Sequence, residues 1–118
     1  MDFRFTPEQE HFRQEIRRFL DAHVTDEMRH EIATSAHTPG PLAKDFLRLL
    51  GAQGWLGIGW PKEYGGQGKT MIEQMIFYDE LDLRDIHYGG LTITSLAMTL
   101  MKLASEDQKR AYLPQILR

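Results

Sequence analysis

The sequence predicts an all-α protein, a bundle of four to five helices with an ordered Gly- and Trp-rich loop between the second and third helices. Three observations favour this class. Apolar residues recur at helical spacing in several segments, and three segments begin with a capping box. No segment alternates apolar and polar residues as a half-buried strand does. The connections are short, and 118 residues suit one domain.

The first helix is expected to run from Pro7 to about His23. Thr6 supplies an N-cap hydroxyl, Pro7 suits the first helical position, and Gln9 can close the capping box. Because apolar residues recur at i, i+4, i+7 and i+8, one stripe should face the core. This stripe consists of Phe12, Ile16, Phe19 and Leu20.

The pattern is weak over residues 25–40, where Met28 and Ile32 indicate only a short turn of helix before a loop. The second helix follows, and Gly54 suits the left-handed position after its end. Gly51 lies inside this helix and lowers its intrinsic stability, which suggests that another segment packs closely there. The expected core stripe is Leu42, Phe46, Leu49 and Leu50.

The segment from Gly54 to Gly68 contains six glycines and Pro61 in fifteen residues, so regular helix is not expected. Its other members are too apolar for a free linker. They include Trp55, Leu56, Ile58, Trp60 and Tyr64. An ordered loop packed on the core is therefore predicted.

Three further helices complete the pattern. Capping boxes at Thr70 and Ser105 open the third and fifth helices, and Pro114 is expected to end or kink the fifth. The third helix has an expected stripe of Ile72, Met75, Ile76 and Leu83. The fourth helix, residues 91–103, follows Gly89-Gly90 and should turn inward Ile93, Leu96, Ala97, Leu100 and Met101.

Composition excludes several classes of function. The net charge of −3 provides no electrostatic footprint for nucleic acid or an anionic membrane. The absence of cysteine excludes a disulfide scaffold and thiolate metal or redox sites. No targeting segment and no apolar run near the ~20 residues of a membrane-spanning helix is present. A cytoplasmic protein is therefore expected.

Two motifs carry weak chemical signals. Gly65 to Thr70 suggests a phosphate-binding loop, but Glu63 occupies the position where that motif requires its first glycine. His11 and Glu15 share one helical face and could supply two metal ligands, although a solvated face explains them better. No metal site is predicted.

An acidic group closes the third helix. Asp79 interrupts the expected apolar stripe, so it alone is predicted to be a buried carboxylate. Such a group could serve in acid–base chemistry, but a structural carboxylate held by amides or a cation is the better interpretation. Glu80, Asp82 and Asp85 are interpreted as a solvated face, with Glu80 and Arg84 forming an i, i+4 pair.

The whole chain resembles the N-terminal helical domain of acyl-CoA dehydrogenases. The residues that carry the resemblance are the Gly54–Gly68 loop, the opening Phe5-Thr6-Pro7-Glu8-Gln9, the third-helix pattern through Asp79-Glu80-Leu81, and the closing Tyr112-Leu113-Pro114. The resemblance implies that residues 1–118 form this one domain. The middle β-domain and the C-terminal helical domain of such enzymes would then be absent.

The resemblance also implies a chemistry. Such enzymes remove hydrogens from the α and β carbons of an acyl-CoA thioester, with FAD as the hydride acceptor. They pass electrons to an acceptor and form homo- or hetero-oligomers. Their catalytic glutamate and main flavin contacts lie beyond this chain, so no residue here is assigned as catalytic or cofactor-binding, and the fragment alone should be inactive. By position, the expected wall of the acyl pocket is Leu91, Thr94, Ser95 and Met98.

One alternative from a different class stays open. The domain could serve as a helical interaction module without catalysis. If the chain is a fragment of such an enzyme, its loop and pocket wall lack their partners, so the isolated chain should expose an apolar patch and tend to self-associate.

Overall fold

The computed structural model describes residues 4–35, 38–87 and 90–118, and every regular element in these ranges is helical. In chain order they are α1 (Pro7–His23), α2 (Asp26–Thr34), α3 (Pro41–Ala52), the 3-10 helix η1 (Lys62–Tyr64), α4 (Met71–Asp82), the π-helical turn η2 (Thr92–Leu96), α5 (Ala97–Leu103) and α6 (Glu106–Ile116). The predicted all-α class is confirmed. The weakly patterned region forms the helix α2, and the expected fourth helix is divided between η2 and α5.

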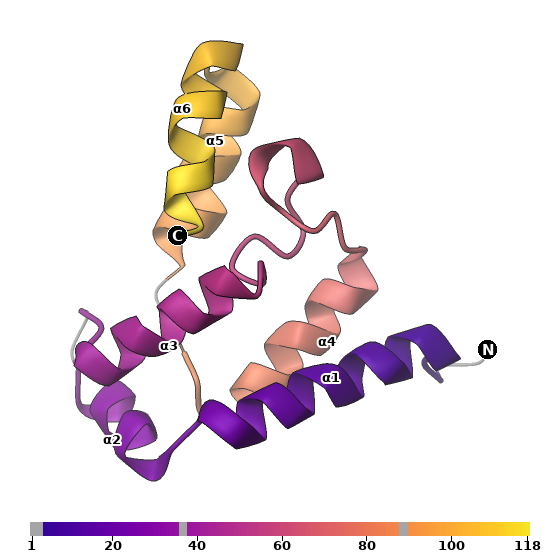
Figure 1. The fold of residues 1–118 in the computed structure, drawn as a ribbon, viewed down its shortest axis with the longest axis vertical. Helices are drawn as coiled ribbons and strands as arrows, with labels where there is room; N and C mark the ends of the chain where they lie inside the picture. Colours follow the sequence, from indigo (N-terminus) through magenta and orange to yellow (C-terminus); the bar gives the residue numbers. More distant parts are fainter. Residues whose placement is uncertain (1–3, 36–37, 88–89) are drawn as a thin grey trace.

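The helices form two groups in Figure 1. Helix α1 lies along α4, and α2 packs against α3 beside them. Helices α5 and α6 form a separate pair at the other end of the molecule, where α6 contacts η1. The chain extends over 41 × 41 × 23 Å, so the arrangement is flat.

The caps that the sequence predicts are present. Capping boxes begin α1 at Thr6, α4 at Thr70 and α6 at Ser105, each with reciprocal bonds between the cap and the residue three positions later. The hydroxyl of Thr25 accepts a hydrogen bond from the backbone N–H of Met28 and begins α2. Each cap satisfies backbone donors that a helix end leaves free.

The loop from Gly54 to Gly68 is part of the core, as predicted. Its five large apolar side chains are all buried. Trp55 contacts Phe19 with 4.8 Å between ring centroids and Phe77 with 5.9 Å, both in edge-on geometry. This geometry favours aromatic pairs beyond their burial alone.

Two glycines have the roles that the sequence predicts. Gly54 has φ of +74°, the left-handed conformation that ends α3. A Cβ on Gly51 would lie 2.6 Å from the carbonyl oxygen of Leu117, so the C-terminal end of the chain can approach α3 only because Gly51 has no side chain.

Parts of the predicted apolar stripes are wrong. In α3, Leu42 and Leu49 are exposed, while Ala43 is buried with Phe46 and Leu50. The predicted set and the buried set both have helical spacing. The smaller Ala43 faces the core because a small side chain permits close contact between α3 and its neighbours. Of the stripe expected for the third helix, Ile72 and Met75 in α4 and Leu83 just after it are exposed, whereas the buried residues of α4 are Ile76, Phe77, Glu80 and Leu81. Apolar residues surround this helix, so periodicity alone does not select one face.

The last two predicted helices also differ in detail. Leu96, which was expected to face inward, lies in the π-helical turn and is exposed, whereas Ala97 is buried as expected. Helix α6 continues two residues past Pro114, to Ile116, so Pro114 does not end it.

Replacing Trp60 tests whether the loop contributes to stability. We expect Trp60→Ala to lower the free energy of unfolding by about 3 kcal/mol or more, because a buried aromatic side chain leaves a cavity. Tyr112→Ala is the control, since Tyr112 is an exposed aromatic residue. Denaturant unfolding of both variants measures the difference, and equal midpoints would show that the loop is not packed.

Candidate functional site

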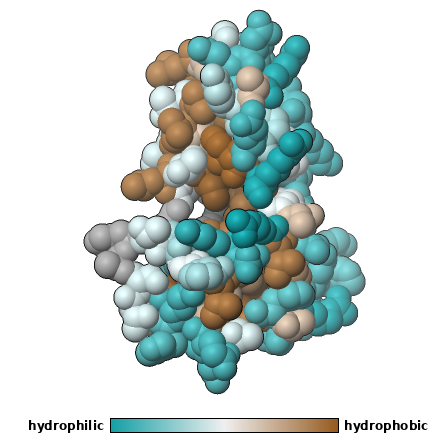
Figure 2. Space-filling model, turned by 60° about the vertical axis from the view of Figure 1, so that its left-hand side comes forward, coloured by the Kyte–Doolittle hydropathy of each residue, from teal (hydrophilic) through white to brown (hydrophobic). Residues whose placement is uncertain are grey.

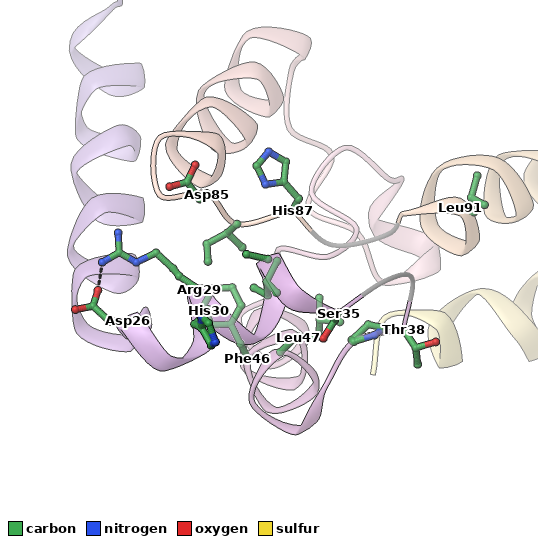
Figure 3. Close-up of a pocket in the computed structure, with 15 residues that line it drawn as sticks. Asp26, Arg29, His30, Ser35, Thr38, Phe46, Leu47, Asp85, His87 and Leu91 are labelled. Carbon is green, nitrogen blue, oxygen red and sulfur yellow. Dashed lines mark hydrogen bonds and ion pairs between the residues drawn. The ribbon is translucent and has the colours of Figure 1, made fainter.

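A cleft of about 1020 Å³ lies between α2, α3 and the segment before η2. We call it the α2–α3 cleft. Its lining residues are Asp26, Arg29, His30, Ile32, Ala33, Ser35, Thr38, Pro39, Ala43, Phe46, Leu47, Asp85, Ile86, His87 and Leu91. In Figure 3, Asp85 and His87 lie across the cleft from Phe46 and Leu47, and Leu91 lies at one end. The sequence did not predict this cleft.

A carboxylate holds the two helices of the cleft together. Glu31 on α2 accepts hydrogen bonds from the backbone N–H groups of Ala43, at 2.8 Å, and Leu42, at 3.2 Å. It therefore caps the N-terminus of α3, where Gly40 has no side chain to do so. This contact joins positions in a weakly patterned region, so periodicity contains no signal for it.

Polar side chains at the cleft are partly engaged with one another. Arg29 pairs with Asp26 one turn earlier in α2. His87 lies 3.6 Å from Asp82, and both side chains are exposed. Asp85 has φ of +56°, a left-handed conformation that turns the chain after α4. These groups lie near solvent, and apolar residues provide most of the remaining lining.

A second pocket of about 320 Å³ lies beside the cleft, between the end of α4 and η2. Leu91 and Thr94, two of the four expected acyl-wall residues, line it. Leu91 lines both cavities. Ser95 and Met98 follow on η2 and α5, are exposed, and line neither cavity.

The π-helical turn determines how these residues are presented. The backbone N–H of Ala97 donates to the carbonyl of Thr92, five residues earlier, and the Thr94 hydroxyl donates to the carbonyl of Gly90 at 2.7 Å. Such turns insert one residue into a helix and are frequent at functional sites. Here the π-helical turn begins beside the residues that line the second pocket.

The buried carboxylate near this region is Glu80, whose side chain is almost inaccessible. Its two oxygens accept hydrogen bonds from Arg17 Nε at 2.8 Å and Arg84 Nη1 at 3.0 Å. Arg84 also binds Asp21, at 2.6 Å. The four residues therefore form an ion-pair network that joins α1 to the end of α4.

The prediction of Asp79 as the buried carboxylate is wrong, and so is the assignment of Glu80 to a solvated face. Asp79 is exposed. The expected pair of Glu80 and Arg84 is confirmed. A second arginine, 63 positions from Glu80, completes its pairing, which the local sequence does not reveal.

The network shifts the titration of Arg84. Burial by itself would lower the pKa of Arg84, but the hydrogen bonds from its guanidinium to Asp21 and Glu80 outweigh burial and raise the pKa. Both carboxylates thus favour the charged form of Arg84. The arrangement is typical of a structural ion pair, because every charged group in it has an opposite partner.

The weak motifs gain no support from the geometry. Lys69 of the glycine-rich segment binds Glu73 at 3.0 Å and lies over the ring of Phe12, 4.6 Å from its centroid. Lys69 is thus engaged with the first turn of α4 and with the core. Among the described residues, no group of three or more histidine, aspartate or glutamate side chains is placed to hold a metal ion.

The described part of the chain also lacks any helix with the length and apolarity needed to cross a membrane.

Comparison with known proteins gives consistent matches over the whole chain. The family described as "Acyl-CoA dehydrogenase, N-terminal domain" matches residues 6–118. Acyl-CoA dehydrogenase FadE26 of Mycobacterium tuberculosis is 37% identical, over 98% of this chain and 30% of that protein. Acyl-CoA dehydrogenase FadE29 of the same organism is 38% identical, over 95% of this chain and 28% of that protein.

Solved structures agree with these relatives. The ChsE4–ChsE5 complex from Mycobacterium tuberculosis matches with a TM-score of 0.83 and 38% identity, over 99% of this chain and 29% of that one. The structure described as "Tcur3481-Tcur3483 steroid ACAD" matches with a TM-score of 0.84 and 36% identity, over 99% of this chain and 30% of that chain. The chain thus spans about 30% of the length of these proteins.

Removing the buried carboxylate tests the network. We expect Glu80→Ala to lower the free energy of unfolding by about 3 kcal/mol, because it leaves Arg17 and Arg84 without their central partner. Asp79→Ala, at the exposed neighbouring position, should change it by less than about 0.5 kcal/mol. Denaturant unfolding compares the two, and equal losses would contradict the assignment of Glu80.

Proposed function

Because this chain belongs to the acyl-CoA dehydrogenase family, we propose that it forms the N-terminal helical domain of an FAD-dependent enzyme that oxidises acyl-CoA thioesters. The reaction removes hydrogens from the α and β carbons of the acyl group. The observation that carries the proposal is the match of this family's N-terminal domain over residues 6–118.

The proposal divides the enzyme between this chain and further domains. Residues 1–118 form the helical domain, and a middle β-domain and a C-terminal helical domain supply the rest. The flat shape supports this division. The radius of gyration is 15.1 Å, whereas a self-contained domain of this length has about 13.5 Å. A flat layer leaves wide faces for other domains to cover.

The exposed apolar side chains also support this division. Figure 2 shows apolar surface gathered over the part of the molecule that holds α5 and α6. Leu91, Leu96, Met98 and Leu103 are large and exposed there. In water such a surface favours association. In the proposed enzyme, substrate and the other domains cover it.

We propose that the start of this region walls the acyl pocket. Leu91 and Thr94 line the second pocket, and Ser95 and Met98 extend the same surface along η2 and α5. Apolar and small side chains suit a hydrocarbon chain, and methionine adapts to its shape. This chain contributes a wall of the site and no catalytic residue.

The cofactor in this proposal is FAD, which accepts the β-hydride when bound. The glycine-rich segment of this chain does not fit as its phosphate site, because Lys69 is paired with Glu73 and the loop is folded into the core. The main flavin contacts therefore belong to the other domains. We propose that the complete enzyme passes its electrons to a separate acceptor. We also propose that the enzyme is cytoplasmic.

Two of the similar solved structures suggest the substrate class and the assembly. One is a complex of two differently named proteins, and the other is described as a steroid ACAD. By analogy we propose a hetero-oligomer with a second acyl-CoA dehydrogenase chain and an acyl group that carries a steroid. The alternative is a helical interaction module without catalysis.

Purification of the complete protein that carries this chain tests the proposal. We expect a yellow protein with FAD that reduces an electron acceptor in the presence of an acyl-CoA. A colourless protein that takes up no added FAD would favour the interaction module.

The pocket wall has its own test in the same protein. Thr94→Trp should raise the KM for an acyl-CoA at least tenfold and leave the FAD content unchanged, because it narrows the second pocket. Leu103→Trp is the control, since Leu103 is exposed near the end of α5 and lines neither cavity. An equal KM for both variants would show that Thr94 does not line the acyl pocket.

A further inference from the structure

The α2–α3 cleft and the second pocket adjoin one another. Ile86, His87 and Leu91 belong to the linings of both, so a ligand that passes Leu91 occupies both cavities. Ile86 is buried at this junction and makes its floor apolar. The larger cavity lies beyond the second pocket, on the side of α2 and α3.

The cleft has the lining of a small-molecule site. Ile32 and Ala33 on α2 face it, as do Phe46 and Leu47 on α3. Its polar groups include Arg29 and His30 on α2 and His87 on the opposite side (Figure 3). The other polar residues of the lining are Asp26, Ser35, Thr38 and Asp85. Binding sites for small molecules typically combine such an apolar lining with a few polar groups.

The size of the cleft favours a broad ligand. Its volume of about 1020 Å³ lies at the upper end of the range of about 300–1,000 Å³ for small-molecule sites. Three separate segments form its walls: α2, α3 and the segment before η2. A straight alkyl chain fills little of this volume, whereas fused rings fill more of it and bury more apolar surface.

We infer that the α2–α3 cleft binds the end of the acyl group remote from the thioester, and that this end is a fused-ring system. The inference rests on the proposed function and locates a site whose lining includes only Leu91 among the four expected wall residues. The polar groups at its edge then lie near a hydroxyl or carbonyl at the far end of the rings. The second pocket holds the part of the acyl group between the rings and the reacting carbons.

The test uses the complete protein with two probes. Cholanoyl-CoA has an acyl group that ends in four fused rings, and butanoyl-CoA has only a short chain. Ala33→Trp places an indole in the cleft from an exposed position on α2. Ala22→Trp is the matched control, because Ala22 is exposed on α1 and lines neither cavity.

We expect Ala33→Trp to raise the KM for cholanoyl-CoA at least tenfold and to leave the KM for butanoyl-CoA within twofold. Ala22→Trp should change neither. FAD content and butanoyl-CoA turnover report folding, and Ala33→Leu supplies a smaller obstruction if Ala33→Trp loses FAD. It should raise the KM for cholanoyl-CoA by a smaller factor.

The opposite results separate this inference from the proposed function. If the wild-type protein oxidises butanoyl-CoA but not cholanoyl-CoA, the ring site and the proposed steroid acyl group both fail, while the proposed oxidation of acyl-CoA thioesters stands. If the Ala33 variants affect both substrates equally, the cleft is not the ring site and the proposed function stands. If the FAD-loaded protein oxidises neither acyl-CoA, the proposed function fails, and the inference fails with it.

Discussion

The packing of the Gly54–Gly68 loop between the two groups of helices is the contact on which the rest of the structure depends. Leu117 packs against Gly57. A Cβ added to Gly57 would lie 2.6 Å from the Cδ1 atom of Leu117. The hydroxyl of Tyr64 donates to Glu106 at 3.3 Å and ties the loop to α6. Burial and the nearby Glu106 carboxylate raise the pKa of Tyr64, so this hydroxyl stays protonated and able to donate at neutral pH. The loop thus connects α5 and α6 to the remaining helices.

This construction explains why the proposed site lies where it does. Helix α5 packs against α6, and Met98 and Leu103 of α5 are exposed, as is Leu96 of η2. The preceding η2 turn lines the second pocket, which adjoins the α2–α3 cleft. The Glu80 network joins α1 to α4, and the Glu31 cap joins α2 to α3. The chain therefore acts as a rigid wall in the proposed enzyme.

The sequence predicted what local chemistry determines. The capping boxes, the left-handed Gly54 and the buried loop depend on neighbouring residues and were correct. Features that depend on distant partners were missed. Glu80 is buried because Arg17 meets it from another helix, and α4 is apolar on so many sides that its buried face could not be chosen. The α2–α3 cleft arises from segments with weak periodicity, whereas the start of the expected fourth helix does line a pocket.

Amide hydrogen exchange in the loop tests the central claim most directly. The backbone N–H of Gly68 donates to Trp60 at 2.8 Å, and that of Lys69 donates to Ile58 at 2.9 Å. Because these bonds join the loop to its own buried core, we expect both amides to be protected to the same degree as those within α4. Exchange of both at the rate of an unstructured peptide, while α4 stays protected, would contradict a packed loop and the account built on it.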